Sequence, residues 1–331
     1  MDPVVVVGAG IAGVACAREL RAAGVEVRVV DRGRRFGGRL ASRRLDGRPV
    51  DLGASYLTVS DDDFRVVVDD WVSREVAFAW TDTFAVLDAD QEPTTKSGPV
   101  RYGAAGGLRS LVEDLAATGD VEVEQGEVGL VARVEGRLEV DGVPAAAVVV
   151  AMPDAQAERL LGDGLEEERG ALTRESEPIL ALAAWWPTRT WDDVAGDRFD
   201  GAFVNGDPDL SWIADDGRRR GDDAPVLVAH STPELAGQHL EDPQAAGPTL
   251  VAALRRVLAI DDEPTGHHVH RWSLARPTGE REAAYLLGEP GADDAGLGVC
   301  GDGWGASPKV ETAWASGRAL GRALADRLRQ L

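Results

Sequence analysis

The sequence predicts an α/β protein in which a parallel sheet is joined to a second, α+β domain with a mixed or antiparallel sheet. A β-branched run at 4–7 and an apolar run at 25–30 indicate strands on either side of an Ala-rich helix at 14–23. A further apolar strand at 297–300 precedes an amphipathic C-terminal helix at 309–329. With 331 residues, the chain has room for about two domains.

Composition excludes several classes of function. The chain carries 35 basic and 57 acidic side chains, a formal charge of −22, so we expect no binding to nucleic acid or to an anionic membrane. No apolar run approaches the ~20 residues that span a bilayer. Two cysteines, Cys16 and Cys300, cannot form a disulfide framework, which favours the cytoplasm and a packing role. The acidic run 61–63 lacks calcium-loop spacing and indicates a solvated helix start, so no metal is expected.

A glycine motif follows the first strand. It reads Gly8-Ala9-Gly10-Ile11-Ala12-Gly13, and Asp31 follows the last glycine by 18 residues, at the end of the second strand. Gly8 permits the tight turn, Gly10 lets a pyrophosphate approach the backbone, and Gly13 lets helix and strand pack closely. The helix start offers free N–H groups to the phosphates, and Asp31 can accept a hydrogen bond from a ribose hydroxyl. The motif predicts a Rossmann-type dinucleotide-binding domain.

A second glycine-rich segment follows Asp31. Arg32 is followed by Gly37-Gly38-Arg39 and, further on, by Gly53-Ala54-Ser55. This pattern resembles the second FAD fingerprint of the flavin amine oxidase superfamily, in which the loop arginine approaches the flavin pyrophosphate. The resemblance implies an FAD-binding domain of the amine oxidase or p-hydroxybenzoate hydroxylase-like kind. No cysteine stands at a covalent-flavin position, so the FAD should be noncovalent.

The C-terminal segment carries the third part of the resemblance. Gly301-Asp302 ends a strand, and the following helix starts around Val310 and Glu311. The resemblance implies that Gly301 and Asp302 meet the FAD ribityl chain. It also implies that the helix dipole lies near the flavin pyrimidine.

Longer segments resemble bacterial renalases along essentially the whole chain. These segments are 51–58, 100–108, 229–234, 270–277 and 301–317. The resemblance implies an FAD oxidase of misreduced NAD(P)H isomers, the 2- or 6-dihydro forms, which returns them to NAD(P)+ and reduces oxygen to hydrogen peroxide. Hydride loss from a dihydropyridine yields an aromatic cation, so the reaction needs no catalytic base.

The domains are predicted to be discontinuous. The FAD-binding domain is expected at 1–55, 103–160 and 291–331, and the substrate domain at 56–102 and 161–290. Within the former, alternating stretches predict a small β-meander of 121–125, 130–134 and 137–140, followed by a buried strand at 148–151.

Four residues are candidates for the substrate pocket. His230 and His270 would donate to a carboxamide or sense flavin charge, although a satisfied core histidine is an equal alternative for each. Arg276 would hold a phosphate or form a structural ion pair. Trp304 would wall the flavin, stack on a nicotinamide or simply pack. The remaining histidines are expected to face solvent: His239, His267 and His268.

Other functions stay open from the residues alone. A flavin amine oxidase, or another FAD-dependent dehydrogenase or desaturase, would use the same cofactor domain on a different small molecule. Many amine oxidases use a lysine near the flavin, and Lys96 and Lys309 are the only lysines here. A pyridine-nucleotide reductase would need a second glycine motif, which is missing, and a non-catalytic flavin-holding protein is the last alternative. We expect a dihydronicotinamide nucleotide or an amine, together with oxygen, as the small-molecule partners; the oligomeric state is not predicted.

Overall fold

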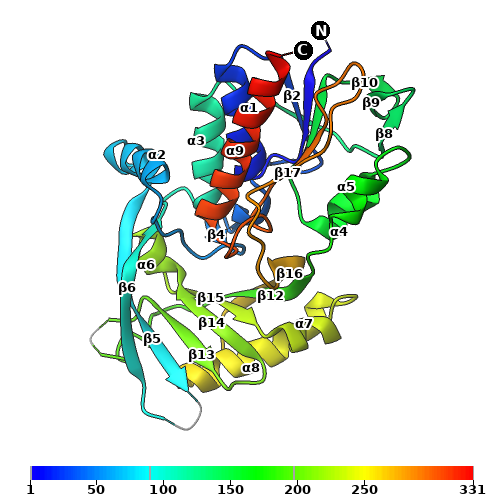
Figure 1. The fold of residues 1–331 in the computed structure, drawn as a ribbon. Helices are drawn as coiled ribbons and strands as arrows, with labels where there is room; N and C mark the ends of the chain where they lie inside the picture. Colours follow the sequence, from blue (N-terminus) through cyan, green and yellow to red (C-terminus); the bar gives the residue numbers. More distant parts are fainter. Residues whose placement is uncertain (1, 89–90, 197, 331) are drawn as a thin grey trace. The chain divides into compact units, whose positions relative to one another are not determined.

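A computed structural model describes residues 2–88, 91–196 and 198–330, and the chain divides into two compact units (Figure 1). Unit 1 comprises Met1–Leu40, Leu111–Ser176 and Pro277–Leu331. Unit 2 comprises Ala41–Ser110 and Glu177–Arg276. Within the described residues no helix is both long and apolar enough to cross a membrane.

The unit boundaries differ from the expected domain boundaries. Segments 41–55 and 103–110 belong to unit 2, whereas 161–176 and 277–290 belong to unit 1. The first difference has a clear cause in the antiparallel hairpin of β3 (Ser42–Leu45) and β4 (Arg48–Asp51). Its Val50 and the following Leu52 pack against strands of the unit 2 sheet, a long-range contact that chain order does not indicate.

Unit 1 is built on a six-stranded sheet in the order β17-β18-β11-β1-β2-β7. The strands are β1 (Val4–Val7), β2 (Val27–Asp31), β7 (Val123–Gln125), β11 (Ala147–Val150), β17 (Leu286–Leu287) and β18 (Leu297–Val299). All pairs are parallel except β17 with β18. The central strands are apolar because helices and loops cover both faces of a parallel sheet.

The predicted meander is wrong in its first strand. Val123 pairs in parallel with Val29, so β7 extends the main sheet instead of joining the meander. The three-stranded sheet that remains consists of β8 (Val131–Val134), β9 (Arg137–Val140) and β10 (Val143–Pro144).

The main helices of unit 1 meet through glycines. The helical segments are α1 (Ile11–Ala22), α3 (Leu108–Thr118), whose first residues belong to unit 2, α4 (Asp154–Ala157), α5 (Glu166–Gly170) and α9 (Val310–Leu328), with short 3-10 turns at Gly38–Leu40 and Glu158–Leu160. A Cβ on Gly317 of α9 would lie 1.9 Å from the carbonyl oxygen of Ala12, and one on Gly321 would lie 2.6 Å from that of Cys16. The two helix backbones therefore pack at a distance that only glycine permits.

Unit 2 is built on a seven-stranded sheet in the order β16-β12-β15-β14-β13-β5-β6. The strands are β5 (Phe78–Asp88), β6 (Thr94–Gly103), β12 (Ser176–Trp185), β13 (Gly201–Asn205), β14 (Leu210–Asp215), β15 (Val226–Ser231) and β16 (Gly266–Pro277). The pairs β12–β15, β14–β15, β13–β14 and β5–β6 are antiparallel, and β13–β5 is parallel. This agrees with the mixed sheet that the sequence predicts.

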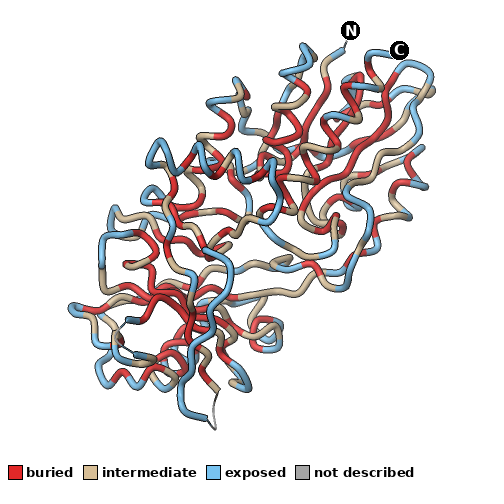
Figure 2. The backbone as a smooth tube through the Cα atoms, turned by 60° about the vertical axis from the view of Figure 1, so that its left-hand side comes forward, coloured by how far each residue is buried: buried red, intermediate tan, exposed pale blue. Residues whose placement is uncertain are grey.

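The two faces of this sheet differ in composition. Its helices are α2 (Asp62–Ser73), α6 (Asp216–Arg220), α7 (Pro233–Gln238) and α8 (Gly247–Leu258), with a 3-10 turn at Pro243–Ala246. Leu227 and Ala229 of β15 belong to an apolar core with α7 and α8, and most strand residues of this core are buried (Figure 2). Val228 points to the other face, toward the β3–β4 hairpin. As predicted, the acidic run starts a helix: Asp61 caps α2 and accepts from the Phe64 amide at 2.8 Å.

The contact of α1 with α9 predicts a stability effect. Gly317→Ala would place a methyl group against the backbone of Ala12, so we expect the unfolding free energy to fall by about 2–3 kcal/mol. Gly237→Ala in α7 is the control, since nothing lies within 4 Å of its Cβ position, and it should be neutral or slightly stabilising. Urea unfolding followed by circular dichroism measures both variants, and equal midpoints for them would contradict the tight contact.

Candidate functional site

The first glycine loop of unit 1 has the geometry of a phosphate cradle. Gly8 has φ +101°, and a Cβ on Gly13 would lie 1.9 Å from the Gly8 carbonyl oxygen, so both positions require glycine. The loop leads into α1, whose N-cap is Gly10, with no capping side chain and no acidic residue in the first turn. The first amides of α1, those of Ile11 and Ala12 among them, therefore have no partner within their helix. Together with the helix dipole, these amides can bind an anion.

Asp31 lies at the end of β2 and closes this loop. One carboxylate oxygen accepts from the Ala9 amide at 2.8 Å, and the other accepts from the Gly33 amide at 2.8 Å. These bonds orient the carboxylate while each oxygen keeps a lone pair for a ribose hydroxyl.

The second glycine segment packs directly on the first. The Gly37 amide donates to the Ala9 carbonyl at 3.0 Å, and a Cβ on Gly38 would lie 3.3 Å from the Cα of Gly10. Arg39 forms an ion pair with Asp302, the residue that follows β18 and Cys300–Gly301. Three segments that are distant in sequence therefore meet inside unit 1.

An arginine that the sequence analysis did not identify holds the C-terminal turn. Arg174 is buried, and its Nη1 donates to the carbonyls of Gly303 at 2.6 Å and Gly305 at 3.0 Å. The Arg281 guanidinium lies over the Trp304 ring, 3.8 Å from its centroid. Trp304 is itself part of the unit 1 core, which agrees with its packing alternative.

The other predicted cofactor residues are distributed over both units. Gly301 donates to the Ser316 hydroxyl at 3.1 Å, Glu311 is buried in the first turn of α9 next to Val310, and Arg32 is exposed. The remaining three lie in unit 2: Gly53, Ala54 and Ser55. Ser55 is buried, and its hydroxyl has no hydrogen-bond partner.

The two candidate histidines lie on strands of the unit 2 sheet. His230 pairs with Trp212 across β15 and β14, and its Nε2 is buried without a partner. Burial, together with the charge of Arg219, lowers the pKa of His230 to about 4. His270 lies edge-on to Trp272, with centroids 4.5 Å apart, and burial is the main cause that lowers its pKa to about 4. Both imidazoles are therefore neutral at pH 7.

Trp212, the residue paired with His230, belongs to an aromatic cluster. We call it the aromatic face; its side chains are Tyr56, Phe78, Trp80, Phe84, Phe203 and Trp212. The ring of Phe84 lies 4.7 Å from Trp212 and 5.3 Å from Trp80, both in edge-to-face geometry. The indole nitrogens of Trp80 and Trp212 are buried and have no acceptor.

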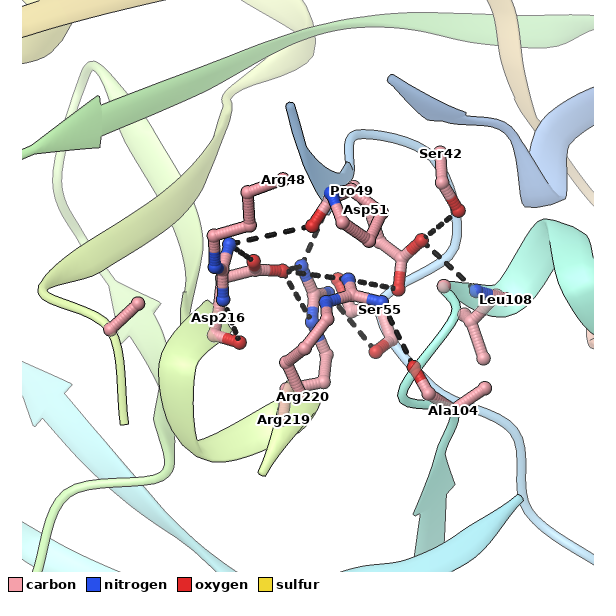
Figure 3. Close-up of polar contacts among 12 residues, drawn as sticks. Ser42, Arg48, Pro49, Asp51, Ser55, Ala104, Leu108, Asp216, Arg219 and Arg220 are labelled. Atoms are coloured by element: carbon pink, nitrogen blue, oxygen red, sulfur yellow. Dashed lines mark hydrogen bonds and ion pairs between the residues drawn. The ribbon is translucent and has the colours of Figure 1, made fainter. Parts of the chain in front are cut away.

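A buried charge network supports this part of unit 2 (Figure 3). Asp216 accepts from Arg219 at 2.5 Å and from Arg220 at 3.2 Å, and Arg220 also donates to Asp51 at 2.8 Å. Burial alone would raise the pKa of Asp216, but Arg219, Arg220 and Arg48 lower it well below its usual value. Asp51 in turn accepts from the amide of Leu108 at 3.0 Å.

The same network fixes two backbone segments (Figure 3). Arg219 donates to the carbonyls of Ser55 at 3.1 Å and Asp51 at 2.9 Å, and Arg220 donates to the carbonyl of Ala104 at 2.9 Å. The sequence offered a partial signal, because Asp216 is followed by arginines three and four positions later, as in helical ion pairs. Their burial depends on long-range packing, which that spacing does not show.

The other sequence expectations have mixed outcomes. Arg276 is exposed and pairs with Glu177 at 2.5 Å, in line with the ion-pair alternative. His267 is exposed as expected, but His268 is not. Both lie on β16, where successive side chains point to opposite faces of the sheet, and the Nε2 of His268 is buried. Cys300 is buried, which raises its pKa to about 12, so its thiol stays protonated. Among the described residues no group of His, Cys, Asp and Glu side chains is arranged to hold a metal.

The fold and the cradle of unit 1 define a protein that binds a dinucleotide through its backbone amides. Comparison with known families gives the class. Residues 6–71 match the family described as an NAD(P)-binding Rossmann-like domain, and residues 60–323 match the family described as flavin-containing amine oxidoreductase. The chain belongs to the flavin-containing amine oxidoreductase family, and FAD is the cofactor that this family implies. The glycine contacts, the uncapped start of α1 and the position of Asp31 fit FAD.

Individual relatives agree with this family. A stretch of 59 residues is 49% identical to a Mycobacterium tuberculosis protein named as a flavin-containing monoamine oxidase, AofH; the match covers 18% of this chain and 13% of that relative. Among solved structures, a protein from Exiguobacterium sp. described as a protoporphyrinogen oxidase has a TM-score of 0.75 at 15% identity over 99% of each chain. Cyclohexylamine oxidase from Brevibacterium oxydans has a TM-score of 0.75 at 13% identity, again over 99% of each chain. At these identities, the structural likeness shows the fold.

The phosphate cradle predicts that a substitution at Gly10 weakens FAD binding without disturbing the fold. Gly10 has φ −73°, and a Cβ there would lie 3.9 Å from the Cα of Gly38, an ordinary contact. Gly10→Ala should therefore fold, yet its methyl group would occupy the approach of the pyrophosphate and weaken FAD binding by about tenfold or more. FAD titration of the apoprotein measures the affinity, circular dichroism checks the fold, and Gly170→Ala in the open α5 serves as control. Unchanged FAD affinity would contradict the placement of the cradle.

The buried, neutral His230 predicts that the folded protein loses stability at acidic pH. Its pKa of about 4 in the folded state lies below the ordinary value of about 6.5, so the unfolded chain binds more protons between these pH values. Stability must therefore fall as pH falls through this window, by about 2 kcal/mol between pH 7 and pH 5 for this one group. His230→Gln should reduce the pH dependence of the urea midpoint by that amount, whereas the exposed His267→Gln should leave it unchanged. A wild-type pH dependence in His230→Gln would be evidence against a buried neutral imidazole.

Proposed function

We propose that this protein is a renalase-like FAD-dependent oxidase, which oxidises 2- or 6-dihydro isomers of NAD(P)H to NAD(P)+ and reduces oxygen to hydrogen peroxide. The observation that carries the proposal is the chemistry of the aromatic face. Its side chains are aromatic rings, and the neutral His230 pairs with Trp212 across the neighbouring strands. Lys96 is exposed on β6, and Lys309 is the N-cap of α9 in unit 1.

This chemistry suits removal of a hydride from a dihydropyridine. The C–H bond breaks, both electrons leave with the hydrogen, and the ring becomes an aromatic pyridinium, so no proton has to be removed by the protein. FAD, when bound, supplies the two-electron acceptor. The protein then has to position a planar ring and keep it ordered, and neither task needs a titrating group.

Residues of unit 2 are suited to positioning. The rings of Tyr56 and Phe203 are only partly buried, and they pack on the buried rings of Phe84 and Trp212. His230, with a pKa of about 4, stays neutral at pH 7 and adds no charge against the pyridinium that forms. The network of Asp216, Arg219 and Arg220 holds the backbone beside these rings.

The runner-up is oxidation of an amine, and the names of the relatives favour it. One of the similar solved structures is a putrescine oxidase bound to putrescine, with a TM-score of 0.71 at 15% identity over 100% of this chain and 99% of that one. An amine with a pKa near about 10 must lose a proton before its hydride can leave. The rings of the aromatic face carry no negative charge that would pair with an ammonium group, and this favours the first proposal.

Anaerobic mixing tests the proposal directly. We expect 2- and 6-dihydro-NAD(P) to bleach the flavin absorbance at least about tenfold faster than ordinary NADH, because a renalase-like oxidase positions the misreduced ring rather than the ordinary one for hydride transfer. Stopped-flow absorbance gives the rates, and a primary deuterium isotope effect at the donor carbon identifies the transferred hydrogen. Bleaching by benzylamine or putrescine, with none by any dihydronicotinamide, would transfer the assignment to the amine oxidase.

A further inference from the structure

An ion pair joins the second glycine segment to the C-terminal turn of unit 1. The Arg39 guanidinium donates to the Asp302 carboxylate, and the two side chains are 27% and 16% exposed. The pair is therefore largely shielded from water and from dissolved salt. Such shielding makes it stronger than an ion pair at the open surface.

This ion pair lies at the same edge of the sheet as the phosphate cradle. Arg39 follows Gly38, and a Cβ on Gly38 would lie 3.3 Å from the Cα of Gly10, the N-cap of α1. Asp302 comes shortly after β18, which is parallel to β11, and β11 is in turn parallel to β1. Arg39 and Asp302 therefore meet at the carboxyl edge of the parallel strands, where an open sheet of this kind binds its ligand.

The backbone on both sides of Asp302 is held by hydrogen bonds. The Gly301 amide donates to the Ser316 hydroxyl of α9 at 3.1 Å, and the Gly303 carbonyl accepts from the buried Arg174 at 2.6 Å. The short side chain of Asp302 thus starts from a fixed backbone. An arginine side chain has many rotamers, and ordering it costs entropy. In this pair the aspartate is the anchor, and the arginine is the group that it orders.

A guanidinium can pair with a carboxylate and a phosphate at the same time. It carries five N–H donors in a planar fork, so one edge can face a carboxylate while another N–H reaches a phosphate oxygen. Ordering the arginine before the phosphate arrives lowers the entropic cost of binding. The negative charge of the aspartate, in contrast, repels the phosphate and by itself would weaken binding. Because these two effects have opposite signs, a binding measurement distinguishes them.

We infer that Asp302 is a positioning residue, which holds the Arg39 guanidinium at the cradle so that this guanidinium binds the pyrophosphate of FAD. Asp302 then acts on the phosphate part of the cofactor through Arg39, in addition to the ribityl contact that the family resemblance implies. The inference concerns cofactor binding, and it holds whichever substrate the enzyme oxidises.

ADP separates the two contacts of Asp302, because it carries the pyrophosphate and the adenosine but no ribityl chain. It is titrated into the apoprotein by isothermal calorimetry, and circular dichroism checks that each variant is folded. Arg39→Met should weaken ADP binding by about tenfold or more. Asp302→Asn should weaken it by about three- to tenfold, because the arginine loses its orientation. Unchanged or tighter ADP binding in a folded Asp302→Asn would refute the positioning role.

A double-mutant cycle assigns the effect to the pair. In the Arg39→Met background, Asp302→Asn should not weaken ADP binding further, because the side chain that Asp302 orders is gone. Additive losses in the double variant would contradict the inference. Asp302→Ser, a second neutral variant with the same expected result, takes the place of Asp302→Asn if the latter does not fold.

Asp120→Asn is the matched control. Asp120 pairs with Arg21 in the same unit at 2.6 Å, so this variant also removes one carboxylate from an arginine and changes the net charge equally. Asp120 has φ +52°, a conformation that asparagine tolerates. The control should leave ADP affinity unchanged. An effect equal to that of Asp302→Asn would indicate a general charge effect and overturn the inference.

Discussion

The structure of unit 1 depends on backbone contacts that exclude a side chain. A Cβ on Gly8 would lie 2.6 Å from the carbonyl of Ala151 after β11, and one on Gly13 would lie 1.9 Å from Gly8 itself. On the far side of α1, Gly317 brings α9 equally close to Ala12. These contacts fix the start of α1 between the sheet and the last helix. Packing, together with the hydrogen bonds of Asp31 to the Ala9 and Gly33 amides, therefore positions the backbone amides that can hold a dinucleotide.

Short-range sequence patterns indicate many of the elements of unit 1, and the sequence therefore predicts these elements well. The strand of valines, the glycine spacing and Asp31 each indicate their own role within a few residues, and β1, α1 and β2 follow. These patterns do not indicate which strands pair with one another over long distances in the sequence. Residues 123–125 alternate like a meander strand, yet they join β2, because parallel pairing depends on which edge of the sheet is free. The strand that carries His268 likewise starts earlier than its flanking Pro and Gly indicate.

The charge network of unit 2 is harder to predict, because the burial of its side chains depends on long-range packing. Arg219 and Arg220 look like ordinary surface arginines, and only the fold buries them against Asp216 and Asp51. Replacing such a buried network with apolar residues is often neutral for stability, so its value lies in specifying one arrangement of the backbone. Here that arrangement concerns the carbonyls of Ser55 and Ala104, which flank the aromatic face.

The position of Arg101 has a structural cause in β6. The pairing of β5 with β6 is regular up to Ala79 opposite Tyr102, then shifts register on both sides of Thr81, the residue paired with Arg101. An irregular ladder re-aims side chains, since one extra residue reverses the face to which a strand points them. The shift lets Arg101 turn back over Phe84 instead of following the exposed run of β6 before it. A local irregularity at one edge of the sheet thus places a guanidinium over the ring of Phe84.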